Sequence, residues 1–219
     1  VALEDNTFVD LPWAVQPDGN GFATFGGARV SERISYSRNV YRGVYNGSNS
    51  SIRDGSYPHE AFTSDGNGGA YAGPISAASA SGVTVPKAVD ISYVGAALAV
   101  IAGAGAGQVA RVAAAVGQTY HIAAPGFAVP LDPASSVVVV APYVGKVLMM
   151  GNVVSNSTVV QIFGSGFDTI YAGNTLEHMY STKVVHPGGL ALMALDYQGG
   201  YQPNMHFELI QNTVHDATG

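Results

Sequence analysis

An asparagine recurs along this chain in one local setting, and this recurrence restricts the possible folds more than any other feature. In five places an Asn follows apolar or alternating residues and precedes Thr or Val and then a bulky apolar residue. These asparagines are Asn6, Asn39, Asn152, Asn174 and Asn212. The most similar surroundings are those of Asn152 and Asn174, which lie 22 residues apart. The longer intervals between the other asparagines can each hold one 22-residue repeat and an additional loop.

A repeat of this length, built from short β-rich runs, is typical of one coil of a right-handed parallel β-helix. Adjacent coils then lie about 4.8 Å apart. An Asn at the same corner of each coil tolerates the left-handed backbone of a tight turn, and its amide can bond backbone groups and the next Asn. We therefore expect a buried asparagine ladder, in which Asn174→Leu costs about 1–3 kcal/mol. The alternative is that the asparagines only mark the turns of a β-sandwich.

The middle of the chain follows a different pattern. Short apolar or alternating runs are separated by Gly, Pro or Asp turns, as in an antiparallel meander. The runs are 71–78, 82–85, 96–102, 108–115 and 119–122. We expect β-helix coils at 1–69, an inserted antiparallel β module at 70–135, and further coils at 136–219, with residues 136–141 returning the chain to the β-helix.

The coils resemble the pectin-lyase-like right-handed β-helix superfamily, which includes polysaccharide lyases, glycosidases, epimerases and phage tailspikes. The resemblance covers about residues 1–60 and 140–219. Segments 103–112 and 130–135 are similar to a small β module inserted in tailspike-like and large bacterial β-helix proteins. The resemblance implies an all-β fold, a right-handed parallel β-helix with an inserted small antiparallel β domain. It implies no particular activity.

Composition excludes several classes of protein. Charged residues make up 11% of the chain, against roughly 25% in an average globular protein, and apolar residues make up 47%, which excludes a disordered polyelectrolyte. Nine basic and fifteen acidic residues argue against a nucleic-acid partner, and the absence of Cys excludes a thiolate metal site. The least polar stretch, residues 94–109, is shorter than the about 20 residues of a membrane-spanning helix, so no membrane span is expected.

The ends of the pattern lie close to a ladder asparagine. We therefore expect the chain to be a piece of a longer protein or a mature form. End coils expose unpaired strand edges, so we also expect an oligomer or flanking domains that cap the β-helix.

A polar loop at residues 53–69 is the first candidate for chemistry. His59, Glu60 and Asp65 are candidate catalytic residues, because His beside a carboxylate suits proton transfer on a sugar. The candidate substrate-binding residues are Arg53, Tyr57 and Tyr71. The alternative is a loop that satisfies its own hydrogen bonds.

Stacking of the coils gives a second candidate. Residues three and four places after the ladder asparagines include a corner cluster of two His and two carboxylates, namely Glu177, His178, His215 and Asp216. Glu177 and His178 are candidate catalytic residues. The cluster suits an acid–base pair or a divalent metal, and the alternative is a set of solvated corner residues. We predict no bound metal and no cofactor.

Low charge, abundant Gly, Ser and Asn, and twelve Tyr favour a surface that meets glycans by stacking and hydrogen bonding. We predict an extracellular or cell-surface β-helix that binds a polysaccharide. Signatures of familiar β-helix enzymes are missing, so the sequence leaves open whether it also cleaves the polysaccharide as a lyase or glycoside hydrolase. The alternative is a non-catalytic structural or adhesive β-helix, as in a tailspike shaft or cell-surface stalk.

Overall fold

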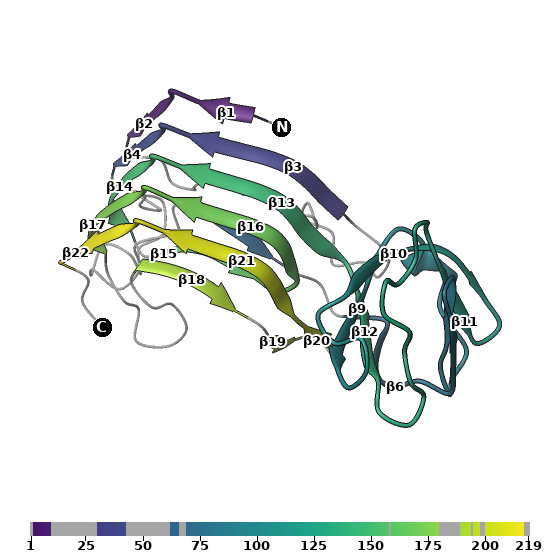
Figure 1. Ribbon diagram of the computed structural model, residues 1–219. Helices are drawn as coiled ribbons and strands as arrows, with labels where there is room; N and C mark the ends of the chain where they lie inside the picture. The colour runs from purple at the N-terminus through teal and green to yellow at the C-terminus, as the bar shows by residue number, and fades with distance from the viewer. Residues whose placement is uncertain are drawn as a thin grey trace.

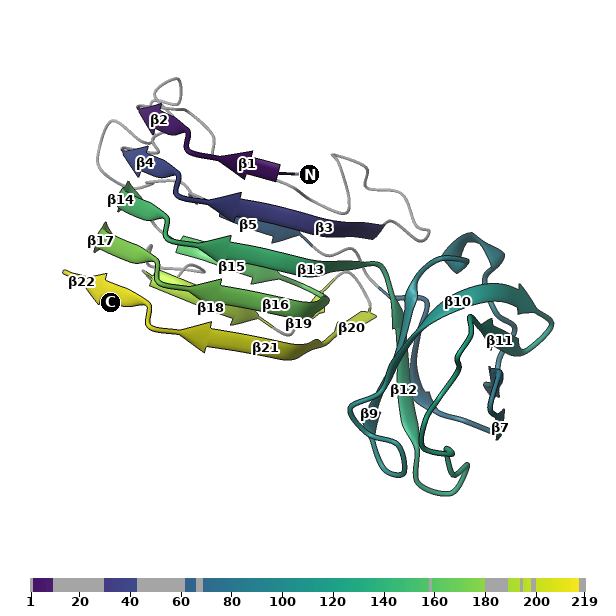
Figure 2. The same cartoon turned by 45° about the horizontal axis from the view of Figure 1, so that its top comes forward.

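The described part of the computed structural model contains three parallel sheets, one larger antiparallel sheet and a two-stranded hairpin (Figure 1). The structure describes residues 2–9, 30–42, 62–65, 69–157, 159–179, 189–193, 195–197 and 200–216. The parallel sheets wind the two ends of the chain into a β-helix, and the antiparallel sheet forms a module beside it (Figure 2). The predicted fold class, a β-helix with an inserted antiparallel module, is confirmed.

Each described coil of the β-helix contributes one strand to the first and second parallel sheets, and three of the coils have a described strand in the third. The first sheet contains β1 (Ala2–Glu4), β3 (Val30–Ser37), β13 (Tyr143–Met150), β16 (Gly166–Ala172) and β21 (Asn204–Ile210). The second contains β2 (Thr7–Val9), β4 (Val40–Arg42), β14 (Val153–Ser157), β17 (Thr175–Met179) and β22 (Thr213–His215). The third contains β5 (Phe62–Asp65), β15 (Val159–Phe163) and β18 (Gly189–Met193). A hairpin of β19 (Leu195–Tyr197) and β20 (Gly200–Gln202) precedes β21.

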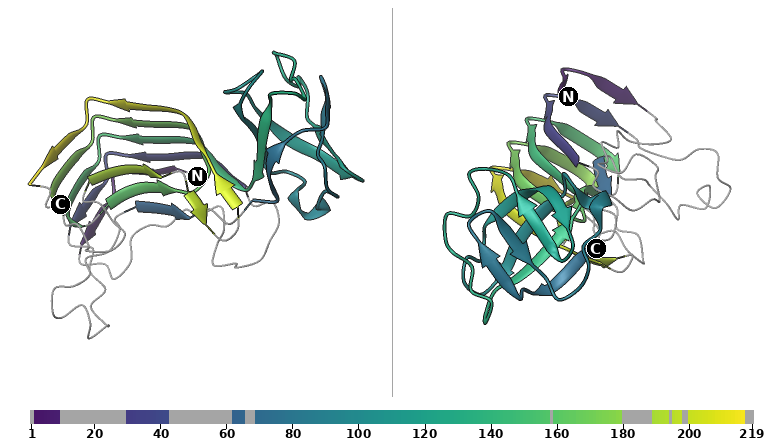
Figure 3. Two further views of the ribbon diagram at one scale, coloured as in Figure 1. Left: turned by 90° about the horizontal axis from the view of Figure 1, so that it is seen from below. Right: turned by 90° about the vertical axis from the view of Figure 1, so that its right-hand side faces the viewer.

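The winding is right-handed. In Figure 1 the strands of the first sheet run from right to left in front, those of the third sheet run from left to right behind, and the coils descend from the N-terminus to the C-terminus. Seen from below in Figure 3, the first and third sheets form two separate layers. Inward-facing side chains of successive coils stack between them, as Tyr36, Met149 and Tyr171 do in register.

The asparagine ladder is confirmed. Asn152 and Asn174 are 1% and 3% exposed, at equivalent corners of adjacent coils. The side-chain amide of Asn152 donates to Asn174 Oδ1 (2.9 Å) and to the Tyr36 carbonyl (2.8 Å). Asn39 donates in the same way to Asn152 Oδ1 (3.1 Å), and Asn174 to Asn212 Oδ1 (2.8 Å). Each amide thus joins neighbouring coils and satisfies a backbone group.

One detail of the expectation is wrong. None of the ladder asparagines has a positive φ; the left-handed residue is the one before each of them. These residues are Asp5, Arg38, Gly151, Gly173 and Gln211, with φ between 50° and 64°. The Asn is therefore selected for its hydrogen bonds and not for its backbone conformation.

The inserted module is a seven-stranded sheet in the order β6-β12-β9-β10-β11-β8-β7. Its strands are β6 (Tyr71–Pro74), β7 (Ala77–Ser79), β8 (Gly82–Thr84), β9 (Ala97–Ala102), β10 (Val109–Val116), β11 (Thr119–Ile122) and β12 (Val137–Ala141). A 3-10 turn, Ile91–Tyr93, lies between β8 and β9. Because β12 pairs antiparallel with β6 and β9, residues 137–141 belong to the module, and the chain re-enters the β-helix at β13 and not at 136–141.

A small apolar core joins the module to the β-helix. Strand β9 turns Leu98 and Val100 into the core of the module, while Ala97 and Ala99 pack against the β-helix side chains Tyr143 and Phe167. The rings of Tyr143 and Phe167 meet edge to face, with centroids 5.5 Å apart. We call this set the junction cluster; it fixes the module against the first sheet. Within the described ranges, no helix has the length and apolar character needed to cross a bilayer.

Candidate functional site

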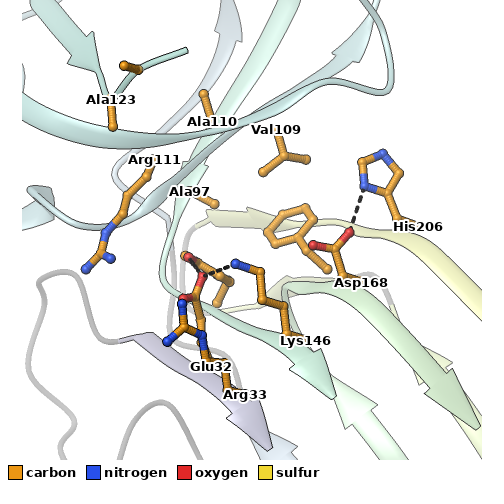
Figure 4. Close-up of a pocket in the computed structure, with 13 residues that line it drawn as sticks. Glu32, Arg33, Ala97, Val109, Ala110, Arg111, Ala123, Lys146, Asp168 and His206 are labelled. Atoms are coloured by element: carbon orange, nitrogen blue, oxygen red, sulfur yellow. Dashed lines mark hydrogen bonds and ion pairs between the residues drawn. The ribbon is translucent and has the colours of Figure 1, made fainter. Parts of the chain in front are cut away.

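A cleft of about 500 Å³ opens where the first sheet meets the module (Figure 4). Its floor includes the buried rings of Tyr143 and Phe167. Its polar side chains are Glu32, Arg33, Lys146, Asp168 and His206 from the β-helix and Arg111 from the module. We call it the junction cleft.

Four of these side chains form a charged column, with one residue from each of four adjacent coils. Arg33, Lys146, Asp168 and His206 occupy equivalent positions on β3, β13, β16 and β21, because the residues on either side of them pair in register. Their φ values lie between 54° and 60°. Side chains of a regular strand point alternately inward and outward, and a residue with left-handed backbone interrupts this alternation. On β13 this residue is Lys146, and as a result Val144 and Val147, three residues apart, both face the interior. The residue next to Val147, Lys146, is thereby turned outward into the cleft.

One end of the junction cleft is built around Glu32. The Tyr143 hydroxyl donates a hydrogen bond to Glu32 Oε1, and Lys146 Nζ lies 3.8 Å from the same oxygen. Burial and the neighbouring Glu32 charge both raise the pKa of Tyr143. Tyr143 therefore stays protonated and holds Glu32 as a donor. Figure 4 shows the guanidinium groups of Arg33 and Arg111 at this same end.

The other end is closed by His206. Its Nδ1 lies 3.3 Å from Asp168 Oδ1, and its Nε2 lies 2.6 Å from the carbonyl oxygen of Gly107. A carbonyl only accepts, so Nε2 carries a hydrogen; when Nδ1 also donates to Asp168, the ring is the imidazolium. His206 thus links the last described coil to the glycine-rich turn of the module, and the link sets the position of one cleft wall.

The junction cleft can bind a polar chain and offers groups for proton transfer. Glu32 and Asp168 lie on strands that flank β13, so their Cα atoms are about two strand spacings, roughly 10 Å, apart. Two carboxylates on either side of a glycosidic bond are the groups that most glycoside hydrolases use. Cations, carboxylates and an imidazole above an aromatic floor are also the groups that hydrogen-bond to sugar hydroxyls.

The predicted corner cluster lies on the second sheet, away from the junction cleft. Glu177 and His215 are in register on β17 and β22, and His178 Nδ1 lies 3.6 Å from Asp216 Oδ2. The four residues therefore come from neighbouring coils at one corner, as the stacking predicted. His178 and Asp216 are largely exposed, and no group of three or more potential metal ligands occurs in the described part of the chain. A catalytic role of Glu177 and His178 stays a prediction.

The polar loop is mostly outside the described residues, which include neither Arg53, Tyr57, His59 nor Glu60. Asp65 ends β5, where it is in register with Phe163. The side chain of Tyr71 is 8% exposed in the core of the module. Its hydroxyl donates to the Pro74 carbonyl, so its ring offers little surface for stacking on a sugar.

The junction cleft is not among the sites predicted from the sequence. The charged column lies six residues before each ladder asparagine from Asn39 onward, so counting backward along the repeat would have found it. Arg111 had no such signal, because it comes from the module and reaches the cleft only through the junction cluster.

No family model and no curated protein matches the chain. Among solved structures, the chain is similar to the tailspike protein gp49 from Pseudomonas phage LKA1, with 10% sequence identity and a TM-score of 0.34. The match covers 84% of this chain and 40% of that chain, so this chain spans less than half the length of the tailspike.

Proposed function

We propose that this chain is an extracellular polysaccharide-binding β-helix of the pectin-lyase-like type, and that a glycan binds in the junction cleft. The observation that carries the proposal is the charged column, which lines the cleft with one polar side chain from each of four coils. At about 4.8 Å per coil the column extends over about 14 Å. It can therefore contact several successive units of a sugar chain.

The composition of the cleft supports the same proposal. A sugar ring has apolar C–H faces and a rim of hydroxyl groups, so its binding site needs an apolar floor and directional polar groups around it. The partly exposed side chains of Val109, Ala110 and Ala123 supply apolar surface over the buried rings of Tyr143 and Phe167. Donors and acceptors at the rim come from Arg33, Asp168 and Arg111. The module and the β-helix form the two walls.

Binding is tested on a glycan array. The cleft variant is Lys146→Gln with Asp168→Asn, which replaces two exposed charges with neutral polar side chains. The matched control is Arg42→Gln on β4, outside the cleft. We expect the cleft variant to bind the recognised glycan at least about tenfold more weakly and the control to bind as the wild type does. Equal binding by the cleft variant contradicts the site, and binding to no glycan favours a structural or adhesive β-helix.

Cleavage is a second candidate, supported by the carboxylate–imidazole pair of Asp168 and His206 in the cleft. The corner residues Glu177 and His178 and the loop residues His59, Glu60 and Asp65 are the competing candidates, with Arg53 and Tyr57 as sugar-binding partners of the loop. Tyr71 is no longer among these partners, because its ring is buried in the core of the module. A general acid or base typically contributes about 10²–10⁴-fold in rate. The residues that carry the reaction should therefore lose turnover on substitution while thermal unfolding stays nearly unchanged.

Three variants separate the candidates. They are Asp168→Asn, the pair Glu177→Gln with His178→Ala, and the pair His59→Ala with Glu60→Gln. Each is incubated with the bound polysaccharide, and new reducing ends and unsaturated uronates are measured. Loss of turnover in one variant alone assigns the reaction to that site. No product from the wild type contradicts cleavage and leaves binding as the proposed function.

A further inference from the structure

We infer that the glycan in the junction cleft is anionic, and that its carboxylate or sulfate groups bind Arg111. This inference rests on the proposed function and names the substrate class of the same site. It is carried by the charges of the described residues that line the cleft and by the contacts of Glu32, Asp168 and Arg111.

Positive charge is concentrated in the cleft of an acidic protein. The whole chain has fifteen acidic and nine basic residues. Among the described residues that line the cleft this balance is reversed, with the cations Arg33, Arg111 and Lys146 against the carboxylates Glu32 and Asp168. At the end of the cleft away from His206, three cations face the single carboxylate of Glu32 (Figure 4). Counted over the described residues that line it, that end has more cations than carboxylates.

Both carboxylates are already engaged. Glu32 accepts a hydrogen bond from Tyr143 and pairs with Lys146, and Asp168 lies beside His206. Among the described residues, no carboxylate lies within ion-pair distance of the guanidinium of Arg111. An anion from outside the chain is therefore the natural counter-charge for Arg111.

The module holds Arg111 in a fixed position. Val109 and Arg111 share one face of β10, and Val109 packs against the junction cluster. Arg111 is also in register with Ala97, a member of that cluster. The Arg111 side chain thus begins beside the packed junction and extends, exposed, into the cleft. Little backbone reorganisation is needed for it to meet a ligand.

The guanidinium chemistry selects the ligand class. Its planar fork of N–H donors matches a carboxylate or sulfate bidentately, and such charge-assisted bonds are roughly twice as strong as neutral ones. A neutral glycan would displace water from Arg111 without supplying the counter-charge. Acidic glycans should therefore bind more tightly than neutral glycans of the same backbone.

The test compares acidic polysaccharides with their own neutral derivatives. Uronate-bearing, sialate-bearing and sulfated glycans are immobilised beside their carboxyl-reduced or desulfated forms, and binding is measured for the wild type, Arg111→Gln and Arg42→Gln. We expect the wild type to prefer the acidic form, and Arg111→Gln to lose about tenfold or more in affinity for it. We expect Arg42→Gln to bind unchanged, and binding to weaken as salt is raised. Thermal unfolding of each variant checks that the fold is intact.

The outcomes separate this inference from the proposed function. Loss of binding on carboxyl reduction or on desulfation identifies which anionic group is recognised. Preference for the neutral forms, or acidic binding that Arg111→Gln leaves unchanged, overturns the inference and leaves polysaccharide binding in place. Binding to none of the glycans overturns both.

Discussion

Replacing Asn174 with Leu tests how much the ladder stabilises the β-helix. The amide of Asn174 takes part in four hydrogen bonds: Oδ1 accepts from the backbone and side-chain nitrogens of Asn152, at 3.0 and 2.9 Å, and Nδ2 donates to the Met149 carbonyl at 3.0 Å and to Asn212 Oδ1 at 2.8 Å. Leucine fills a similar volume and makes none of these bonds. The buried N–H of Asn152 is left without its partner.

The cost follows from these contacts. An orphaned buried donor costs about 1–3 kcal/mol, and each of the three other lost bonds about 0.5–1.5 kcal/mol. Neighbouring contributions are not additive, so we expect a total loss of about 3–5 kcal/mol in the free energy of unfolding. This exceeds the about 1–3 kcal/mol expected from the sequence, because that figure covers one donor left without a partner, whereas the structure shows three further bonds of the same side chain.

Asn212→Leu is the matched control. Asn212 occupies the last described coil and is half-buried, so water can replace part of what its amide loses. Urea unfolding followed by far-ultraviolet circular dichroism, at one protein concentration, measures the wild type and both variants. A loss for Asn174→Leu below about 1 kcal/mol, or an equal loss for Asn212→Leu, would refute the reasoning.

Three further predictions follow from burial, backbone conformation and exposed surface. Burial raises the pKa of Tyr36 to about 12, so the unfolded chain, with a tyrosine pKa of about 10, releases this proton first. The contribution of Tyr36 to the free energy of unfolding should therefore be constant below about pH 10 and fall above it, and a urea midpoint that does not change between about pH 9 and pH 12 would count against this. Gly103→Ala should lower the thermal unfolding temperature more than Gly117→Ala, because a Cβ at Gly103 would lie 2.0 Å from the Ser135 carbonyl oxygen. Gly117 has a similar positive φ but open space around it, so equal shifts would show that the close approach does not matter. Phe207 and Leu209 are 49% and 53% exposed on the last described coil, and an exposed apolar coil edge favours association with another chain, so light scattering should detect oligomers. A stable monomer of 22.5 kDa at high concentration would contradict this prediction.

The fold was largely predictable because the signals that specify it are local and repeated. Each ladder asparagine comes with the same flanking pattern, and the amides themselves set the register between coils. The Gly and Pro turns of the module likewise separate its strands. The boundary near residue 136 was wrong for a physical reason: the run Val137–Val140 is apolar throughout, and such a run suits a strand of either sheet.

The junction cleft was much less predictable. Arg33 and Lys146 adopt positive φ without being Gly or Asn, so no turn signal marks the point where they leave the strand alternation. Arg111 depends on the packing of Ala97 and Val109 against Tyr143 and Phe167, which are distant in sequence. The corner cluster, in contrast, was found by counting forward from the ladder, because its geometry follows directly from the repeat.

A crystal structure of the protein with the glycan that binds best on the array tests the central claim most directly. The account predicts ordered sugar units along the charged column, between Arg111 and His206, with an anionic group of the glycan on the Arg111 guanidinium. Sugar bound at the corner of Glu177 and His178, or on a surface remote from the junction of the β-helix and the module, would contradict it.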